Sequence, residues 1–196
     1  NLGSEPAGTN DAIVVNGDLS PGGSPIYVLP LAPLGTGSYP LLTYTGSKSG
    51  SFDPVVRGVS QLRQSLSLDE TGTPQQVNLV VAGLPAGLVW NAVGSTNWDI
   101  GSSFNWMDEV TFLPEQYYQG DRVRFDDAPG VLTTVHLDGP VMPGAVTVAA
   151  ETNAFVFSGP GGIGGALTFT KAGTNVLTVS VTNSYAGSTI ISNGTV

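Results

Sequence analysis

Short runs of alternating apolar and polar residues recur along the chain, separated by turns that are rich in glycine, proline and asparagine. Residues 167–170 and 177–181 are two such runs near the C-terminal end. Alternation with a period of two predicts strands that bury one face. The pattern therefore predicts an all-β chain.

Residues 1–84 show this pattern in a less regular form. Strands are predicted within residues 11–19, 25–29 and 40–44, with prolines at their margins. Residues 66–68 and 77–81 flank a polar segment and predict a hairpin, while the spacing within residues 57–68 also admits one helical turn. Residues 83–87, Gly-Leu-Pro-Ala-Gly, are the best candidate for a domain boundary.

From Phe125 onward the alternation becomes almost regular in spacing. One inward apolar residue per strand gives a series at nearly constant intervals, namely Phe125, Leu137, Val148, Phe157, Phe169, Val179 and Ile190. Strands of near-constant length without helices between them are expected in a β-solenoid or an elongated β-sandwich. With two strands per coil, one solenoid turn takes about 22 residues and advances the stack by about 4.8 Å.

The same alternation assigns the neighbouring side chains to faces. Val123 and Val135 join the inward set, whereas Arg122, Arg124 and His136 are predicted to face outward. Three regions follow: solenoid coils ending in a hairpin (1–84), a Trp-rich connecting segment (85–127), and a strand repeat (128–196).

The connecting segment contains all three tryptophans of the chain. Clustered aromatic residues predict a cap or satellite core, because they bury large areas. An exposed row of flat rings would instead stack on sugars. The residues assigned to glycan contact under this alternative are Trp98, Trp106, Tyr117 and Tyr118.

Composition narrows the classes of function. Charged residues make up 11% of the chain, against about 25% in an average soluble domain. The net charge of −9 repels phosphate backbones, so nucleic acid is not an expected partner. Cysteine is absent, which excludes disulfides and thiolate metal sites. No apolar run approaches the roughly 20 residues of a membrane span.

Candidate chemistry is sparse, and no catalytic residue or cofactor is predicted. His136 is the only histidine, so no catalytic relay can be assembled around it. Asp121, Asp126 and Asp127 are weak candidates for calcium ligands.

Two further groups of residues bear on possible chemistry. A polysaccharide-degrading enzyme needs carboxylates that converge in a groove, for which Asp99, Asp108, Glu109 and Asp121 beside the tryptophans are the available set. The glycine-rich residues 159–165 lack the ending of a phosphate-binding loop, and their glycines are expected to serve positive φ angles at corners.

Residues 159–196 resemble a known repeat. Glycine pairs, Lys171, Gly173, Asn183, Tyr185 and Gly187 follow one another at offsets similar to those of the autotransporter-associated β-strand repeat family. The pairs Asn97-Trp98 and Asn105-Trp106 resemble the segment that often precedes this repeat, whereas Asn175 replaces a glycine that the family usually has. The resemblance implies parallel β-helices in long bacterial surface proteins.

The alternation of apolar and polar residues at the C-terminal end of the sequence continues into its N-terminal end. Reading from Thr195 and Val196 into Asn1 and Leu2 preserves the alternation of outward and inward residues. We therefore expect a structural unit of an extracellular bacterial filament, assembled head to tail or as one period of a tandem array. Its expected partners are copies of itself, at the outer cell surface. An adhesin module that binds surface glycans and a polysaccharide-degrading β-helix enzyme are the alternatives.

Overall fold

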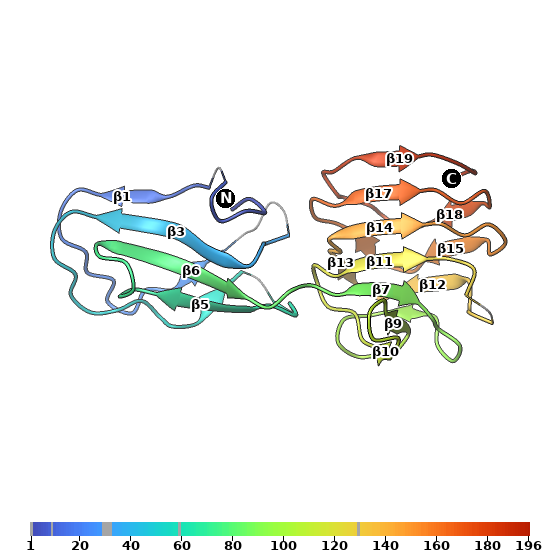
Figure 1. The fold of residues 1–196 in the computed structure, drawn as a ribbon, viewed down its shortest axis with the longest axis horizontal. Coiled ribbons are helices and arrows are strands. Elements are labelled where there is room, and N and C mark those ends of the chain that lie inside the picture. Colours follow the sequence, from blue (N-terminus) through green and yellow to red (C-terminus); the bar gives the residue numbers. More distant parts are fainter. Residues whose placement is uncertain (1, 9, 29–32, 59, 129) are drawn as a thin grey trace. The chain divides into compact units, whose positions relative to one another are not determined.

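The computed structural model describes residues 2–8, 10–28, 33–58, 60–128 and 130–196. They form two compact units, Asn1–Leu84 and Pro85–Val196, drawn in Figure 1. The division falls in the glycine- and proline-containing segment that the sequence indicated. Every regular element of the described residues is a strand, so the predicted all-β class is confirmed and the helical turn considered for residues 57–68 does not form.

The first unit contains a four-stranded sheet and a small two-stranded one. The larger sheet has the order β1 (Ile13–Val15), β3 (Gly37–Tyr44), β6 (Gln76–Ala82) and β5 (Ser65–Asp69), and the smaller one pairs β2 (Ile26–Tyr27) with β4 (Val56–Arg57). β1 lies parallel to β3 and β2 parallel to β4, and an isolated parallel bridge joins Leu19 to Lys48 between them. The chain therefore passes twice, in the same direction, along this side of the unit.

The predicted hairpin closes the other side of this sheet. β5 and β6 are antiparallel, and β6 also pairs antiparallel with β3. The carboxylate of Asp69 accepts hydrogen bonds from the backbone N–H groups of Thr71 and Gly72, which lowers its pKa and fixes the turn. Buried Tyr39, Leu79 and other apolar residues form the core beneath the sheet.

The second unit is built from three sheets. The longest has the order β10 (Pro114–Glu115), β9 (Trp106–Asp108), β7 (Gly87–Trp90), β11 (Arg122–Phe125), β14 (Ala145–Val148), β17 (Thr168–Lys171) and β19 (Thr189–Ile191). The second has the order β18 (Leu177–Val179), β15 (Phe155–Ser158), β12 (Thr134–Leu137) and β8 (Asn97–Trp98), and the third pairs β13 (Pro140–Val141) with β16 (Gly162–Ile163).

Pairing in these sheets is parallel from β7 to β19, from β8 to β18, and between β13 and β16. Val123 pairs with Val146 and Val146 with Phe169, so the chain returns to the long sheet at equal intervals along the sequence. In the third sheet, Val141 pairs with Ile163 after a similar interval. We call one such pass through the sheets a rung. The two-residue strands of the third sheet were not foreseen.

The inward series is mostly confirmed. Phe125, Leu137, Val148, Phe157 and Phe169 are buried in one core, and the alternation on β11 and β12 is as predicted. Val179 is only half-buried against this core. The prediction for Ile190 is wrong: it pairs with Thr170, which faces outward, and 47% of its surface is exposed. The inward residues of β19 are Thr189 and Ile191.

The predicted connecting segment 85–127 is not a separate body. β7 and β11 lie side by side in the long sheet, next to β14, and all three tryptophans belong to the same core as residues 128–196. Between them, β9 and β10 form an antiparallel hairpin along the outer edge of β7. Of the three tryptophans, only Trp106 lies in this hairpin.

Candidate functional site

The last rung of the second unit leaves its interior uncovered. β19 pairs with β17 and is the end strand of the long sheet, at the top of this unit in Figure 1. Ile191 aligns with the buried Lys171 and so faces inward, yet 55% of its surface is exposed. Val196 is 53% exposed. An apolar cross-section therefore faces outward at this end of the stack.

The first rung of the first unit has a similar edge. β1 is the end strand of its sheet, and its Ile13 aligns with the buried Leu42 of β3. Because paired residues of parallel strands point to the same side, Ile13 faces the core, although 63% of it is exposed. Leu2 is buried in the core of the first unit.

Of the four residues predicted to form a junction, the structure describes three. Thr195 bridges Val176 in parallel, as the alternation requires, and Val196 follows it at the open end of the second unit. Leu2 belongs to the first unit, and Asn1 lies outside the described residues. The structure thus places Thr195 and Val196 at the end of the second unit and Leu2 in the core of the first.

Lys171 is a buried residue that the sequence indicated only as one position of the repeat motif. Its side chain is fully buried, and its ammonium group donates to the backbone carbonyl oxygens of Gly173 and Asn193, the latter at 3.4 Å. A Cβ on Gly194 would lie 2.5 Å from the carbonyl oxygen of Gly173, and the φ of Gly194 is +75°. A buried ammonium requires such partners. Lys171 therefore ties the last rung to β17 from inside.

The aromatic cluster lies inside the second unit. Trp98, Trp106 and Tyr117 are at most 1% exposed, and their rings meet edge to face or tilted at centroid distances of 5.4 to 6.1 Å. Burial raises the pKa of Tyr117 well above its usual value. The predicted glycan-contact face is therefore wrong for these three residues, since buried rings cannot stack on a sugar. The fourth, Tyr118, is partly buried, and its hydroxyl contacts Gln116.

Each of the candidate calcium ligands contacts other groups of the protein. Asp121 is fully buried and accepts from the N–H groups of Ala86 and Tyr118. Asp126 contacts Arg124 at 3.3 Å. Among the described residues, no three acidic or histidine side chains are placed to share a metal ion.

Asp127 links two successive rungs. Its carboxylate accepts from the N–H groups of Glu151, Thr152 and Asn153 at 2.7 to 2.9 Å, and from the hydroxyl of Thr152. These hydrogen bonds, that of Glu151 first, lower the pKa of Asp127 to about 2. The side chain therefore fixes the corner of the next rung and has little spare capacity for a metal ion.

Two of the carboxylates considered for an enzyme, Asp99 and Asp108, are engaged in their own turns. Asp99 accepts from the N–H and hydroxyl of Ser103, and Asp108 accepts from the N–H groups of Val110 and Thr111. The carboxylate of Glu109 lies against Gly87. His136 faces outward as predicted and contacts Asp138 at 3.4 Å.

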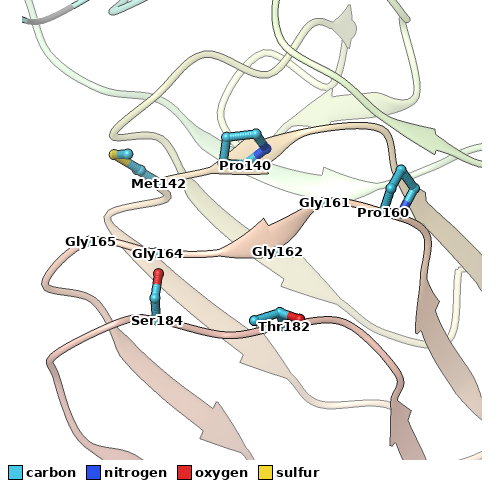
Figure 2. A pocket seen from close by; sticks show the side chains of 9 residues that line it. All are labelled: Pro140, Met142, Pro160, Gly161, Gly162, Gly164, Gly165, Thr182 and Ser184. Atoms are coloured by element: carbon cyan, nitrogen blue, oxygen red, sulfur yellow. The ribbon is translucent and has the colours of Figure 1, made fainter.

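A shallow depression of about 220 Å³ lies on the face formed by the third sheet. Figure 2 shows its glycine floor and the side chains around it, which come from three rungs: Pro140, Met142, Pro160, Gly161, Gly162, Gly164, Gly165, Thr182 and Ser184. It exists because the middle rung has glycines where its neighbours carry side chains. This lining contains no titratable group and therefore offers no acid or base.

These glycines serve two different purposes. Gly159 and Gly165 have φ values of +110° and +88°, as predicted for corners. Gly161 and Gly162 are required by close packing instead, because a Cβ on Gly162 would overlap the carbonyl oxygen of Thr182. The expectation that all of them serve positive φ angles is therefore only partly correct.

The tip of the β9–β10 hairpin is a feature that the sequence analysis missed. Val110, Phe112 and Leu113 are 63 to 82% exposed, and Phe112 has a φ of +57°. A bulky side chain rarely adopts this conformation. Hydrogen bonds to the backbone and carboxylate of Asp108 hold the turn. The hairpin thus presents a fixed apolar tip, at the end of the long sheet opposite to β19 (Figure 1).

Comparisons with known proteins do not assign the chain to a family. No family model matches the chain, and no curated protein or solved structure matches it. In the described part of the chain, no helix is long and apolar enough to cross a membrane.

Proposed function

We propose that this chain is a structural repeat unit of an extracellular bacterial surface fibre, built as a parallel β-solenoid. The observation that carries the proposal is the parallel stacking of strands in the second unit, whose aligned inward residues form one core. Copies of the chain would join head to tail, or follow one another as periods of a tandem array.

The pairing pattern supports a solenoid over a β-sandwich. Sandwiches are built from antiparallel sheets, whereas the strands from β11 to β19 and from β12 to β18 pair in parallel. The interval between the paired Val141 and Ile163 matches the about 22 residues expected for one coil. Aligned inward residues such as Val123, Val146 and Phe169 then form a continuous core along the stack.

The resemblance to the autotransporter-associated β-strand repeat supports the same function. Two of the residues on which the resemblance is based hold neighbouring rungs together in this chain. Lys171 ties the last rung to β17, and the side chain of Asn183 accepts from the N–H of Ile163 one rung before. Residues that bind one rung to the next are what a repeat of stacked rungs requires.

The proposal implies an extracellular environment. A chain with 11% charged residues and no cysteine relies on strand ladders and an apolar core for stability, as a long extracellular fibre can. In a solenoid without a polar cap, the exposed end associates with another end. A contact of this kind that does not close on itself generates a filament.

The proposal is tested by labelling and imaging intact cells of the producing bacterium. Antibodies against the chain should label fibres outside the cell, and mild protease treatment of intact cells should remove the label. Label found only after the cells are broken open, or on compact particles without fibres, would contradict the proposal.

A further inference from the structure

Two columns of residues cross the depression on the third sheet, and each runs from an apolar residue over a glycine to a residue with a hydroxyl group. The columns are Pro140, Gly162 and Thr182, and Met142, Gly164 and Ser184 (Figure 2). Pairing of Pro140 with Gly162 fixes the register of the first column. In the second, a Cβ on Gly164 would lie 3.2 Å from Oγ of Ser184 and 4.0 Å from Cγ of Met142. Both side chains therefore border the space above this glycine.

The depression thus has an apolar wall and a hydroxyl wall. The walls stand one rung to either side of the glycines, so their backbones lie about 9.6 Å apart, twice the spacing of neighbouring strands. Thr182 and Ser184 are exposed, and neither hydroxyl forms a hydrogen bond with another described residue. Both hydroxyl groups are therefore available to a ligand.

Side chains on the neighbouring rungs hold the two walls in place. The side-chain amide of Gln119 donates to the carbonyl oxygen of Pro140 at 3.3 Å and accepts from the N–H of Met142 at 2.5 Å. On the other side, the side chain of Asn183 accepts from the N–H of Ile163 at 3.2 Å. The depression is therefore formed before any ligand arrives, as binding sites for small molecules usually are.

The backbone of the floor is already engaged within the sheet. The N–H groups of Gly161 and Gly164 donate to the preceding rung, and the carbonyl oxygens of Ile163 and Gly165 accept from the following one. A peptide that binds by adding a strand needs free backbone groups of this kind. The floor therefore offers a ligand the CH surface of its glycines, and the hydroxyl wall supplies the hydrogen bonds.

Charge and size narrow the class of ligand. The lining contains no charged side chain, so it does not hold a cation or an anion by an ion pair. The net charge of −9 also repels anionic ligands. The volume of about 220 Å³ lies below the range of about 300–1,000 Å³ that is typical of pockets for drug-sized molecules. A small neutral ligand with one apolar side and one hydroxyl-rich side matches this site.

We propose that the depression binds one ring of a neutral sugar. The CH face of the ring lies on the glycines and against Pro140 and Met142, and its hydroxyl groups bond to Thr182 and Ser184. The inference goes beyond the proposed fibre function and does not depend on it. In a fibre, one such site on each copy would raise the avidity for a surface that displays the sugar.

The test is a titration of the isotope-labelled full chain, followed by the NMR shifts of its backbone amides. The probes are the methyl glycosides of glucose, galactose and mannose. A site without charges or aromatic rings should bind with a dissociation constant on the order of 1–10 mM. We expect at least one probe to cause saturable shifts that centre on Met142, residues 161–165 and residues 182–184. Without saturable shifts from any of the three, the proposal is overturned.

Two variants address the floor and the hydroxyl wall separately. Gly164→Ala fills the depression, because the added Cβ meets only the ends of two flexible side chains within 4 Å. The combined change Thr182→Val and Ser184→Ala removes both hydroxyl groups. We expect each variant to bind the sugar about tenfold more weakly, with unchanged amide shifts elsewhere in the chain. Binding at native strength by both variants would contradict the site.

Thr147→Val is the matched control for the hydroxyl wall. Thr147 faces outward from β14 in the long sheet, so its hydroxyl is removed from a strand that does not line the depression. We expect it to bind the sugar like the native chain. A loss equal to that of the combined variant would show that binding does not depend on Thr182 and Ser184, and would overturn their role.

Two further probes test the choice of occupant. Glucuronate, a sugar ring with a carboxylate, should bind more weakly than the neutral glycosides because of the negative charge of the chain. The neutral peptide trialanine should cause no saturable shift at these amides. Tighter binding of trialanine than of every sugar would identify a peptide site and overturn the proposal.

The sugar site and the fibre function can fail separately. Fibres on cells without sugar binding would retain the structural function and remove the site. Saturable binding in the depression by a chain that forms no fibres would retain the site alone.

Discussion

Phe125→Ala tests whether the aromatic cluster is the structural centre of the second unit. Phe125 is fully buried, and its ring centroid lies 4.8 to 5.7 Å from those of five others, namely Trp90, Trp98, Trp106, Phe155 and Phe157. Truncating a buried Phe to Ala costs about 3–5 kcal/mol. Because rigid rings surround the site, the cavity collapses little, and we expect a cost of about 4 kcal/mol.

The assay is denaturant unfolding followed by tryptophan fluorescence, since all three tryptophans are buried in the second unit. A loss of about 4 kcal/mol is a large share of the 5–15 kcal/mol that stabilise a typical protein. In a thermal scan it lowers Tm by on the order of 15 °C for a domain of this size.

Phe112→Ala is the matched control, because the same side chain is removed from a site that is 70% exposed. We expect it to change the free energy of unfolding by less than about 0.5 kcal/mol. A cost below about 1 kcal/mol for Phe125→Ala, or equal costs for the two variants, would refute the assignment of this core.

Three further predictions concern the rungs. Phe169→Asp places a carboxylate in the core and should abolish fibre assembly, whereas His136→Ala should leave assembly unchanged, as judged by electron microscopy. Intact fibres of the Phe169→Asp variant would contradict the assignment of Phe169 to the core. Gly162→Ala should cost about 1–3 kcal/mol in a melting experiment, because its Cβ overlaps a backbone carbonyl oxygen, whereas Gly139→Ala, with open space, should be neutral; equal Tm values would refute the close packing. Asp127 has a folded pKa of about 2, so its contribution is present above its ordinary pKa of 3.8 and lost as the pH falls towards 2. The Tm difference between the native chain and Asp127→Asn should accordingly vanish near pH 2, and a difference that persists there would count against the carboxylate's role.

The strands and most of the core were predictable, because alternation is a local property. Five of the seven predicted inward residues are buried, and the hairpin of β5 and β6 forms where polar turn residues separate two apolar runs. The error at Ile190 has a physical cause. Residues 189–191 read Thr-Ile-Ile, and either phase of the alternation places an isoleucine inside. Pairing with Thr170 selects the phase, and that pairing is not local.

The candidate sites were less predictable, because burial depends on tertiary structure. The sequence indicated an aromatic cap and left an exposed face as its alternative, and only the packing of Trp98 and Trp106 on Phe125 decides between them. Alternation from Phe169 places Lys171 inside, but a lysine is rarely buried without partners. Its partners are backbone carbonyl oxygens, one of them in the next rung, which no side-chain motif reveals.

Cryo-electron microscopy of the native fibres tests the central claim most directly. We expect a solenoid with rungs about 4.8 Å apart. Copies should follow one another along the fibre, with their strands stacked in parallel. Closed, separate particles would contradict the account.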